Sequence, residues 1–340
     1  CVQAAALFDQ YGRSPVPAIQ NLRNMIPSLT SVSGPEIRPP RTAQQTLELV
    51  TTASKLLAHI NIPSYTKGLG SETLSNILRI LTELMVQLGF IVRKEKASLI
   101  KGLYVIIDPM VTGGRDPITI AQASVRGGAS VLQLRDKFRD KGESLALALD
   151  LQKLCASSGV SLIINDHVDI AAIVGSAGLH VGQTDIPVDA ARQVLAPGQM
   201  LGRSNSGIEQ LVESEHMGAD HVAFGAVFET NTTGKKLNRA PKGVEQLRIA
   251  KDNARTPLVA IGGINASNIA SVVEAGADAI CLTAAVASAP EPEAAAADLQ
   301  LVVLAQHVLH DVGGRWVREE ICLLYTSDAA AEGLGVDLGG

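Results

Sequence analysis

The sequence predicts an α/β protein whose main part is a (β/α)8 barrel, the TIM barrel architecture, preceded by a small, mainly helical region. From Leu103 onward, short apolar runs alternate with segments of helical period, and this alternation recurs about eight times. Several of the apolar runs end abruptly in charged or amide side chains. That pattern is expected where parallel strands deliver functional residues to one end of a barrel.

The composition narrows the class of protein. The chain has 340 residues, of which 46% are hydrophobic and only 3% aromatic, so an aliphatic core is expected. A net charge of −5, without a Lys/Arg-rich run, argues against a nucleic-acid partner. We find neither a signal peptide nor an apolar run of membrane-spanning length, and therefore expect no membrane partner.

The four cysteines have no metal-ligand spacing, which indicates reduced thiols and a cytoplasmic location. The chain begins with Cys1 rather than Met, as expected for a fragment without its original N-terminus. Homo-oligomerisation is compatible with the sequence.

Residues 1–99 form the predicted helical region, to which we assign no role in the chemistry. Apolar residues at helical spacing and the breakers between them define its elements. These are a short helix near Ala18–Met25, a helix over Thr42–Ile60, a second helix from Ser71 to Gly89, a short strand at Phe90–Val92 and a linker at Lys94–Lys96.

Residues 100–305 form the predicted barrel domain. The strands are expected at Leu103–Asp108, Val131–Arg135, Ser161–Asn165, Leu179–Gly182, Met200–Ser204, His221–Phe228, Pro257–Gly262 and Ala279–Thr283. The helices are expected at Ile118–Gly127, Glu143–Ser158, Val168–Val174, Val188–Leu195, Ile208–Met217, Val244–Asn253, Ala266–Ala275 and Pro292–Leu304.

A doubly wound sheet is the competing architecture, but it would place its nucleotide-binding glycines after the first strand. Here the pair Gly262-Gly263 follows the seventh predicted strand. Residues 306–340 form an irregular tail, part of which, Cys322–Glu332, resembles translated sequencing-adapter sequence.

Polar residues follow three consecutive strands of the predicted barrel. Gln133, Arg135 and Lys137 alternate, so a strand would send them to one side. Asp166 and Asp185 end the third and fourth runs. Either aspartate alone is as well explained as a helix N-cap. Beside two cations, a Mg2+ site that binds a diphosphate is the better interpretation.

A second anion site is expected at the ends of strands seven and eight. Gly262-Gly263 lets the backbone approach an anion, and the loops after these strands are the usual phosphate site of a barrel. Thr283-Ala284 would supply further backbone N–H groups. The loop Phe228–Lys236 is polar and suits an anionic substrate. His167, His180 and His221 form no zinc constellation and are interpreted as hydrogen-bonded or solvent-facing.

The ordered motifs QLRDK, ND, HVGQTD, LGRS, VAFGAVFET and AIGGI resemble those of the thiamine-phosphate synthases, over about Gly102–Val286. The resemblance implies a transferase that joins 4-amino-2-methyl-5-(diphosphooxymethyl)pyrimidine to a thiazole phosphate with Mg2+ and releases diphosphate. Its partners would thus be small molecules. By matching position, Asp166 and Asp185 would hold the metal. The implied substrate-binding residues are Gln133, Arg135, Lys137, Asn165, Ser204, Thr230, Thr232, Lys235, Gly263, Thr283 and Ala284.

Among these, the resemblance gives Arg135, Lys137, Ser204 and Lys235 roles in the reaction itself. The chain departs from the family pattern in two places. Glu229 stands where the family has proline, and Thr233-Gly234 precede the lysine, so Lys236 is an alternative to Lys235. Thr283-Ala284 replaces Val-Ser. The alternative functions are a thiazole tautomerase of the related barrel family and a non-catalytic phosphate-binding regulator.

Overall fold

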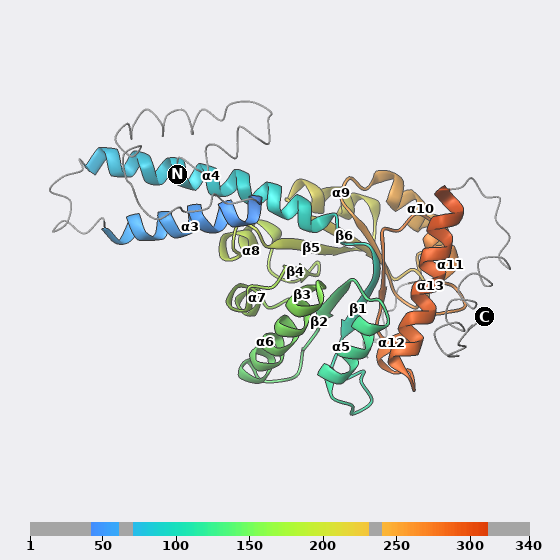
Figure 1. Ribbon diagram of the computed structural model, residues 1–340. Helices are drawn as coiled ribbons and strands as arrows, with labels where there is room; N and C mark the ends of the chain where they lie inside the picture. Colours follow the sequence, from blue (N-terminus) through green and yellow to red (C-terminus); the bar gives the residue numbers. More distant parts are fainter. Residues whose placement is uncertain (1–41, 61–70, 231–239, 312–340) are drawn as a thin grey trace, which may run out of the picture.

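The computed structural model describes residues 42–60, 71–230 and 240–311. Its centre is a closed barrel of parallel strands in which each strand pairs with the next and β8 pairs with β1 (Figure 1). The structure therefore confirms the predicted (β/α)8 barrel. The strands are β1 (Gly102–Ile107), β2 (Val131–Leu134), β3 (Ser161–Asn165), β4 (Gly178–Val181), β5 (Met200–Asn205), β6 (His221–Gly225), β7 (Leu258–Ile261) and β8 (Ala279–Leu282).

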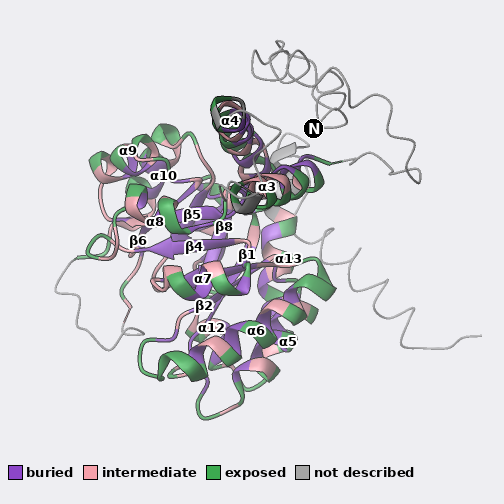
Figure 2. Ribbon diagram, turned by 90° about the vertical axis from the view of Figure 1, so that its left-hand side faces the viewer, coloured by how far each residue is buried: buried purple, intermediate pink, exposed green. Residues whose placement is uncertain are grey.

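Helices surround the barrel and turn their buried sides toward it (Figure 2), and apolar residues on these sides belong to the main hydrophobic cluster. The start of α5 shows how the sequence sets an element boundary. Asp116 accepts a hydrogen bond from the backbone N–H of Thr119 at 3.0 Å, and Pro117 occupies the first helical turn. The helices are α5 (Pro117–Arg126), α6 (Lys141–Ser158), α7 (Val168–Val174), α8 (Val188–Val194), α9 (Ile208–His216), α10 (Gly243–Asn253), α11 (Ile269–Glu274), α12 (Ala284–Ala287) and α13 (Pro292–Asp311).

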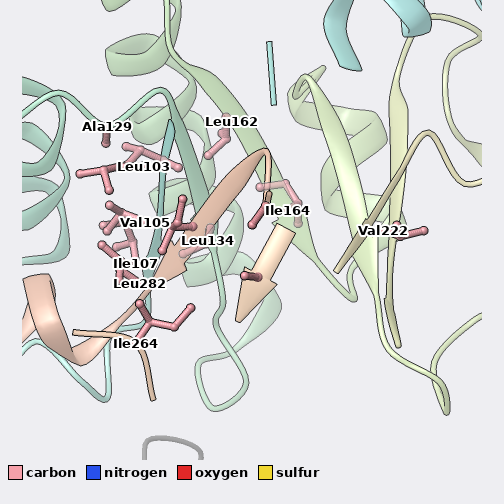
Figure 3. Close-up of a cluster of buried hydrophobic side chains, with 14 of the residues drawn as sticks. Leu103, Val105, Ile107, Ala129, Leu134, Leu162, Ile164, Val222, Ile264 and Leu282 are labelled. Atoms are coloured by element: carbon pink, nitrogen blue, oxygen red, sulfur yellow. The ribbon is translucent and has the colours of Figure 1, made fainter. Parts of the chain in front are cut away.

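Alternation along each strand divides the core into two layers. In β1, Leu103, Val105 and Ile107 face the helices and belong to the larger cluster, part of which Figure 3 shows. Tyr104 and Ile106 face the barrel interior and belong to a second cluster. Full burial of such an aliphatic side chain stabilises the fold by about 1.5–3 kcal/mol. The cores are aliphatic, as the composition predicts.

The N-terminal helices α3 (Ala43–Ile60) and α4 (Ser71–Ala97) lie side by side and share a buried cluster (Figure 1). The predicted strand at Phe90–Val92 and linker at Lys94–Lys96 are wrong, because α4 continues through both. Gly89 does not end the helix. It lies against the barrel, where an added Cβ would come within 2.5 Å of the Pro197 carbonyl oxygen. The predicted helix at 18–25 lies outside the described residues.

The end of α4 is attached to the barrel by polar and apolar contacts. Arg93 pairs with Asp220 at 3.1 Å and donates to the Pro197 carbonyl at 2.5 Å. Ala97 and the following Ile100 belong to the interior cluster of the barrel. The helical region and the barrel thus share one core at this end.

One stretch of α4, Leu74–Ala97, is long and apolar enough to cross a membrane by length and composition alone. The expectation that the chain has no such run is therefore wrong. Its buried residues, among them Leu81 and Leu88, pack against α3 in the shared cluster. The stretch is therefore accounted for here as a packing helix.

Several barrel elements differ in length from the prediction, among them β6 and α13. β6 ends at Gly225 rather than Phe228, since the backbone then turns toward the loop after β7. There the N–H of Phe228 donates to the Gly262 carbonyl at 3.0 Å. The last helix, α13, continues to Asp311, beyond both the predicted end at Leu304 and the predicted domain boundary at 305.

Candidate active site

A cavity of about 530 Å³ lies where the carboxyl ends of the strands meet. Every site residue predicted from the sequence that the structure describes lines it. These residues are Gln133, Arg135, Lys137, Asn165, Asp166, Asp185, Ser204, Thr230, Gly263, Thr283 and Ala284. Thr232 and Lys235, together with the alternative Lys236, lie in residues 231–239, outside the described part of the chain.

The β2 side of the cavity carries two cations. β2 itself ends at Leu134, so Arg135 and Lys137 follow the strand rather than belong to it. They nevertheless reach the cavity beside Gln133, as the alternating pattern predicts. Asp136, between them, is buried elsewhere and accepts a hydrogen bond from the Ser144 hydroxyl at 2.8 Å.

Sequence reasoning missed two residues that support this side. Asp108, at the end of β1, is buried and forms an ion pair with Arg135, while its other oxygen accepts the backbone N–H of Met110 at 3.0 Å. The hydroxyl of Tyr104 accepts a hydrogen bond from the amide of Gln133 at 2.6 Å. Asp108 could have been found from the sequence, because it is the polar residue that ends the first apolar run. Tyr104 had no comparable signal.

Asp166 and Asp185 lie together at the ends of β3 and β4. Burial raises the pKa of Asp166, and the neighbouring Asp185 carboxyl adds to the increase, while Lys137 opposes it. The ammonium of Lys137 is 2.9 Å from Asp166. Asp166 also has a positive φ of 62°, a conformation that aspartate tolerates and that often marks functional positions.

The helix-cap interpretation of the two aspartates is wrong. His167 precedes α7 and Pro187 precedes α8 at the cap positions, and neither helix has a side-chain cap. Asp185 instead accepts the backbone N–H of Gly182 at 2.7 Å within the loop. Both carboxylates therefore keep oxygen atoms available to the cavity.

The donor set fits a hard divalent cation. Carboxylate oxygens are the ligands that Mg2+ prefers, and it commonly takes only one or two of them from the protein. Burial is the main cause of the raised pKa of Asp166, with a smaller contribution from Asp185, and a bound cation would favour the charged form of this carboxylate. Among the described residues, no larger cluster of histidine, cysteine or carboxylate groups suits a metal. The remaining ligands would have to come from water or substrate.

The opposite rim is built from glycine and short loops. Gly262 and Gly263, after β7, have φ values of 104° and 69°. A Cβ on Gly263 would overlap the Glu229 carbonyl oxygen and come within 2.8 Å of the Phe228 Cβ. Glycine is thus required for the loops after β6 and β7 to meet here. The side-chain amide of Asn268, which was not predicted, donates to the Gly263 carbonyl at 3.0 Å.

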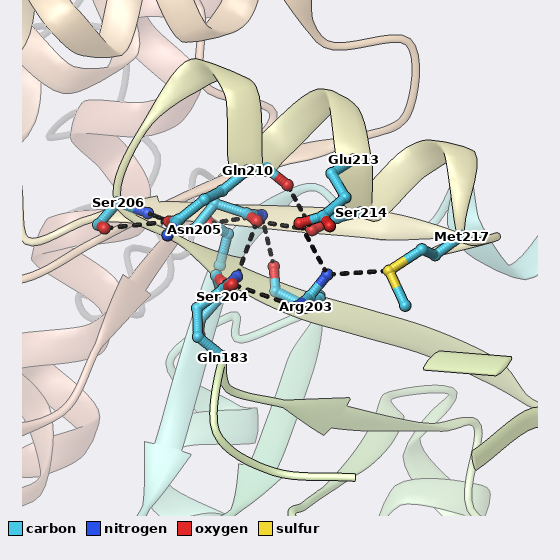
Figure 4. A network of polar contacts seen from close by, with 10 residues as sticks. Gln183, Arg203, Ser204, Asn205, Ser206, Gln210, Glu213, Ser214 and Met217 are labelled. Carbon is cyan, nitrogen blue, oxygen red and sulfur yellow. Dashed lines mark hydrogen bonds and ion pairs between the residues drawn. The ribbon is translucent and has the colours of Figure 1, made fainter. Parts of the chain in front are cut away.

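Ser204 on β5 is held by a polar network (Figure 4). The Gln183 amide donates to the Ser204 carbonyl at 2.5 Å and to the side-chain oxygen of Asn205 at 3.2 Å. The Ser214 hydroxyl donates to the same Asn205 oxygen at 2.6 Å. These contacts leave the Ser204 hydroxyl directed to a different partner, His180, whose Nε2 lies 2.8 Å away.

The histidines differ from one another. His180 and His221 are both buried, and His180 lines the cavity, so neither is solvent-facing. His180 was therefore missed as a cavity residue. His167 contacts the Asp136 carbonyl oxygen at 3.1 Å. Cys281 also lines the cavity, but burial raises the pKa of its thiol, which keeps it protonated and poorly nucleophilic.

Comparison with known proteins identifies the family. Residues 103–286, more than half of the chain, match the family model described as thiamine monophosphate synthase. The chain belongs to the thiamine monophosphate synthase family. Thiamine-phosphate synthases from Shouchella clausii and Chloroflexus aurantiacus are 37% and 39% identical to it. These alignments cover 57% and 59% of this chain and 91% and 92% of the relatives.

A solved structure supports the family assignment. The barrel resembles a thiamine phosphate pyrophosphorylase from Pyrococcus furiosus with a TM-score of 0.57 and 30% sequence identity. The likeness covers 62% of this chain and 98% of that chain. The match to the family model begins in β1, so α3 and α4 lie outside it.

Proposed function

We propose that this family member is a thiamine-phosphate synthase that joins 4-amino-2-methyl-5-(diphosphooxymethyl)pyrimidine to a thiazole phosphate and releases diphosphate. One observation carries the assignment of both substrates to this cavity. A rim with Arg135, Lys137, Asp166 and Asp185 faces a glycine-rich rim across the same 530 Å³ cavity. The first rim suits a metal-bound diphosphate, and the second suits a phosphate monoester.

The diphosphate would bind to Arg135 and Lys137. Because Asp108 holds one side of the Arg135 guanidinium, the remaining N–H groups keep a defined direction toward the cavity. Negative charge grows on the diphosphate as its bond to the pyrimidine methylene breaks. Preorganised cations at that place stabilise the departing group more than the bound substrate.

We propose that this family member uses Mg2+ and that Asp166 and Asp185 hold it. When bound, it neutralises charge on the diphosphate. Lys137 would contact the diphosphate from the same side of the cavity. The proposal rests on the two neighbouring carboxylates and on the Lys137 ammonium, 2.9 Å from Asp166.

The pyrimidine would lie against Gln133, Asn165 and Ser204. These side chains offer amide and hydroxyl groups to the ring. The ring then carries the transient positive charge, and the thiazole nitrogen attacks the methylene carbon. No base is needed at that carbon, which agrees with the protonated state of Cys281.

The thiazole phosphate would bind at the second rim. Gly263 permits close approach of the backbone. After the neighbouring strand β8, Thr283 immediately precedes α12 and Ala284 is its first residue. Thr230 lines the same cavity. We assign Thr232 and Lys235 to this loop on the resemblance alone.

A thiazole tautomerase would need the glycine rim but no diphosphate site. The two cations and two carboxylates at the opposite rim favour the synthase. The deciding assay incubates the protein with both substrates and Mg2+ and measures thiamine phosphate and diphosphate. Equimolar appearance of the two products is expected. Binding of the thiazole phosphate without product would favour the regulator, and isomerisation of the thiazole alone would favour the tautomerase.

We also propose that residues 1–99 take no direct part in the chemistry. In the part of this region that the structure describes, no residue lines the cavity. A chain beginning at Ala97 should keep KM for both substrates but unfold at a lower temperature, because it loses the Arg93–Asp220 pair. A chain beginning at Ser71 is the control that retains α4. Raised KM values in a folded Ala97 chain would contradict the proposal.

A further inference from the structure

Two buried histidines meet inside the barrel, next to Ser204. His180 on β4 lies opposite Gly202 on β5, and Gly202 lies opposite His221 on β6. Nδ1 of His180 is 3.5 Å from Nε2 of His221, and Nε2 of His180 is 2.8 Å from the Ser204 hydroxyl. The three side chains therefore form one chain of hydrogen bonds that ends at the cavity.

Gly202 makes this meeting possible. An added Cβ there would overlap Nε2 of His221 and come within 2.7 Å of Nδ1 of His180. The strand between the two histidines, β5, must therefore have glycine at this position. The rings are tilted by 33°, with centroids 5.6 Å apart, so they meet through their nitrogen atoms rather than by stacking.

Each ring carries one proton near neutral pH. Burial lowers the pKa of His180 to about 4, and burial together with His180 lowers the pKa of His221 to about 3. Two proton arrangements satisfy the chain. In the first, His221 donates to His180, and His180 donates to Ser204, which keeps its own O–H for the cavity. In the second, the direction of every hydrogen bond is reversed, and the Ser204 hydroxyl donates to His180 instead of to the cavity.

The environment of His221, at the far end of the hydrogen-bond chain, decides between the two proton arrangements. Among the residues that the structure describes, none forms a hydrogen bond with the buried Nδ1 of His221. In the second arrangement this atom would be a buried N–H without an acceptor. In the first it is only an unpaired acceptor. Among backbone groups an orphaned N–H is the rarer of the two, and the same desolvation argument favours the first arrangement here.

We propose that His221 is a positioning residue that, through His180, sets the Ser204 hydroxyl as a hydrogen-bond donor toward the cavity. The proposal rests on the proposed function where it assigns Ser204 to the pyrimidine. A donor at this place selects a ring that presents an unprotonated nitrogen, as an aminopyrimidine does. It disfavours a ring with an N–H at the same position, because two donors would face each other.

The first test needs no substrate. Protein labelled with nitrogen-15 in histidine is studied at pH 7 by long-range proton–nitrogen correlation, which distinguishes the two neutral tautomers. His180 and His221 are both expected to carry the proton on Nε2. A proton on Nδ1 of His180 would overturn the proposal, whatever reaction the protein catalyses.

The second test uses kinetics. His221→Phe removes the donor, so the KM for the pyrimidine diphosphate should rise roughly fivefold, while the KM for the thiazole phosphate stays unchanged. His221→Gln places an amide N–H near the same atom and should restore most of the affinity. Phe224→Leu, on the same strand but facing the helices, is the control for general destabilisation.

Equal pyrimidine KM values for wild type and a folded His221→Phe variant would overturn the proposal. So would an equal rise in both substrates' KM values in His221→Phe and Phe224→Leu. If the variants do not fold, the tautomers of the wild-type protein decide. Absence of any product with the wild-type protein would overturn the proposed function, whereas the tautomer measurement would still test the hydrogen-bond chain.

Discussion

Arg135 offers the sharpest test of the mechanism. Its guanidinium performs two tasks, because Asp108 holds one side and the remaining N–H groups face the cavity. Lysine at this position keeps the charge but loses the planar fork, so it cannot pair with Asp108 and meet the diphosphate with the same fixed geometry. We therefore expect Arg135→Lys to lose transition-state stabilisation rather than substrate affinity.

The magnitude follows from the loss of one preorganised donor at a site of developing charge, which costs about 10²–10³ in rate, or roughly 2.7–4 kcal/mol. The assay is steady-state kinetics with saturating Mg2+ and thiazole phosphate. Arg139→Lys is the matched control, since Arg139 lies 3.9 Å from Asp136 and does not line the cavity. A tenfold rise in KM for the pyrimidine diphosphate with unchanged kcat would refute the reasoning.

Three further predictions follow from the same geometry. Asp185→Asn should raise the Mg2+ concentration needed for half-maximal rate with little change in melting temperature, and an unchanged Mg2+ requirement would contradict the metal site. Gly263→Ala should raise the KM for the thiazole phosphate at least tenfold, because the added Cβ overlaps the Glu229 carbonyl and the φ is positive; Gly142→Ala, which meets nothing within 4 Å, is the control. Acid should destabilise the fold through His180 and His221, whose pKa values are lowered to about 4 and 3. The unfolded chain binds more protons below about pH 6.5, so their stabilisation falls as pH drops from 6.5 toward 3, and urea titrations that show no such fall would contradict buried, neutral rings.

The barrel was predictable because its evidence is local and repeated. Each strand is an apolar run of a few residues, and each run ends in side chains that line the cavity, as Asn165-Asp166 does after β3. Alternation also placed Gln133, Arg135 and Lys137 on one side, although β2 ends before the last two. Beyond the strand, the backbone N–H of Arg135 still donates to the Ile107 carbonyl of β1 at 3.0 Å.

The errors arose where distant contacts override local signals. Gly89 resembles a helix end, yet it is the residue that lets α4 approach the barrel at Pro197. The positive φ of Asp166, in contrast, had no signal in the sequence. Asp108 and His180 escaped prediction because their roles depend on partners, Arg135 and Ser204, that lie far away in the sequence.

The two rims of the cavity have a consequence for how such an enzyme changes over time. The cations and carboxylates come from β2 to β4, whereas the glycine turn and Thr283-Ala284 come from β7 and β8. Because the rims share few residues, a substitution on one rim can alter the binding of one substrate without affecting the binding of the other. The departures from the family pattern at Glu229 and at Thr283-Ala284 both fall on the rim that we propose for the thiazole phosphate. The rim proposed for the diphosphate has Arg135 and Lys137 beside Asp166 and Asp185 in this chain.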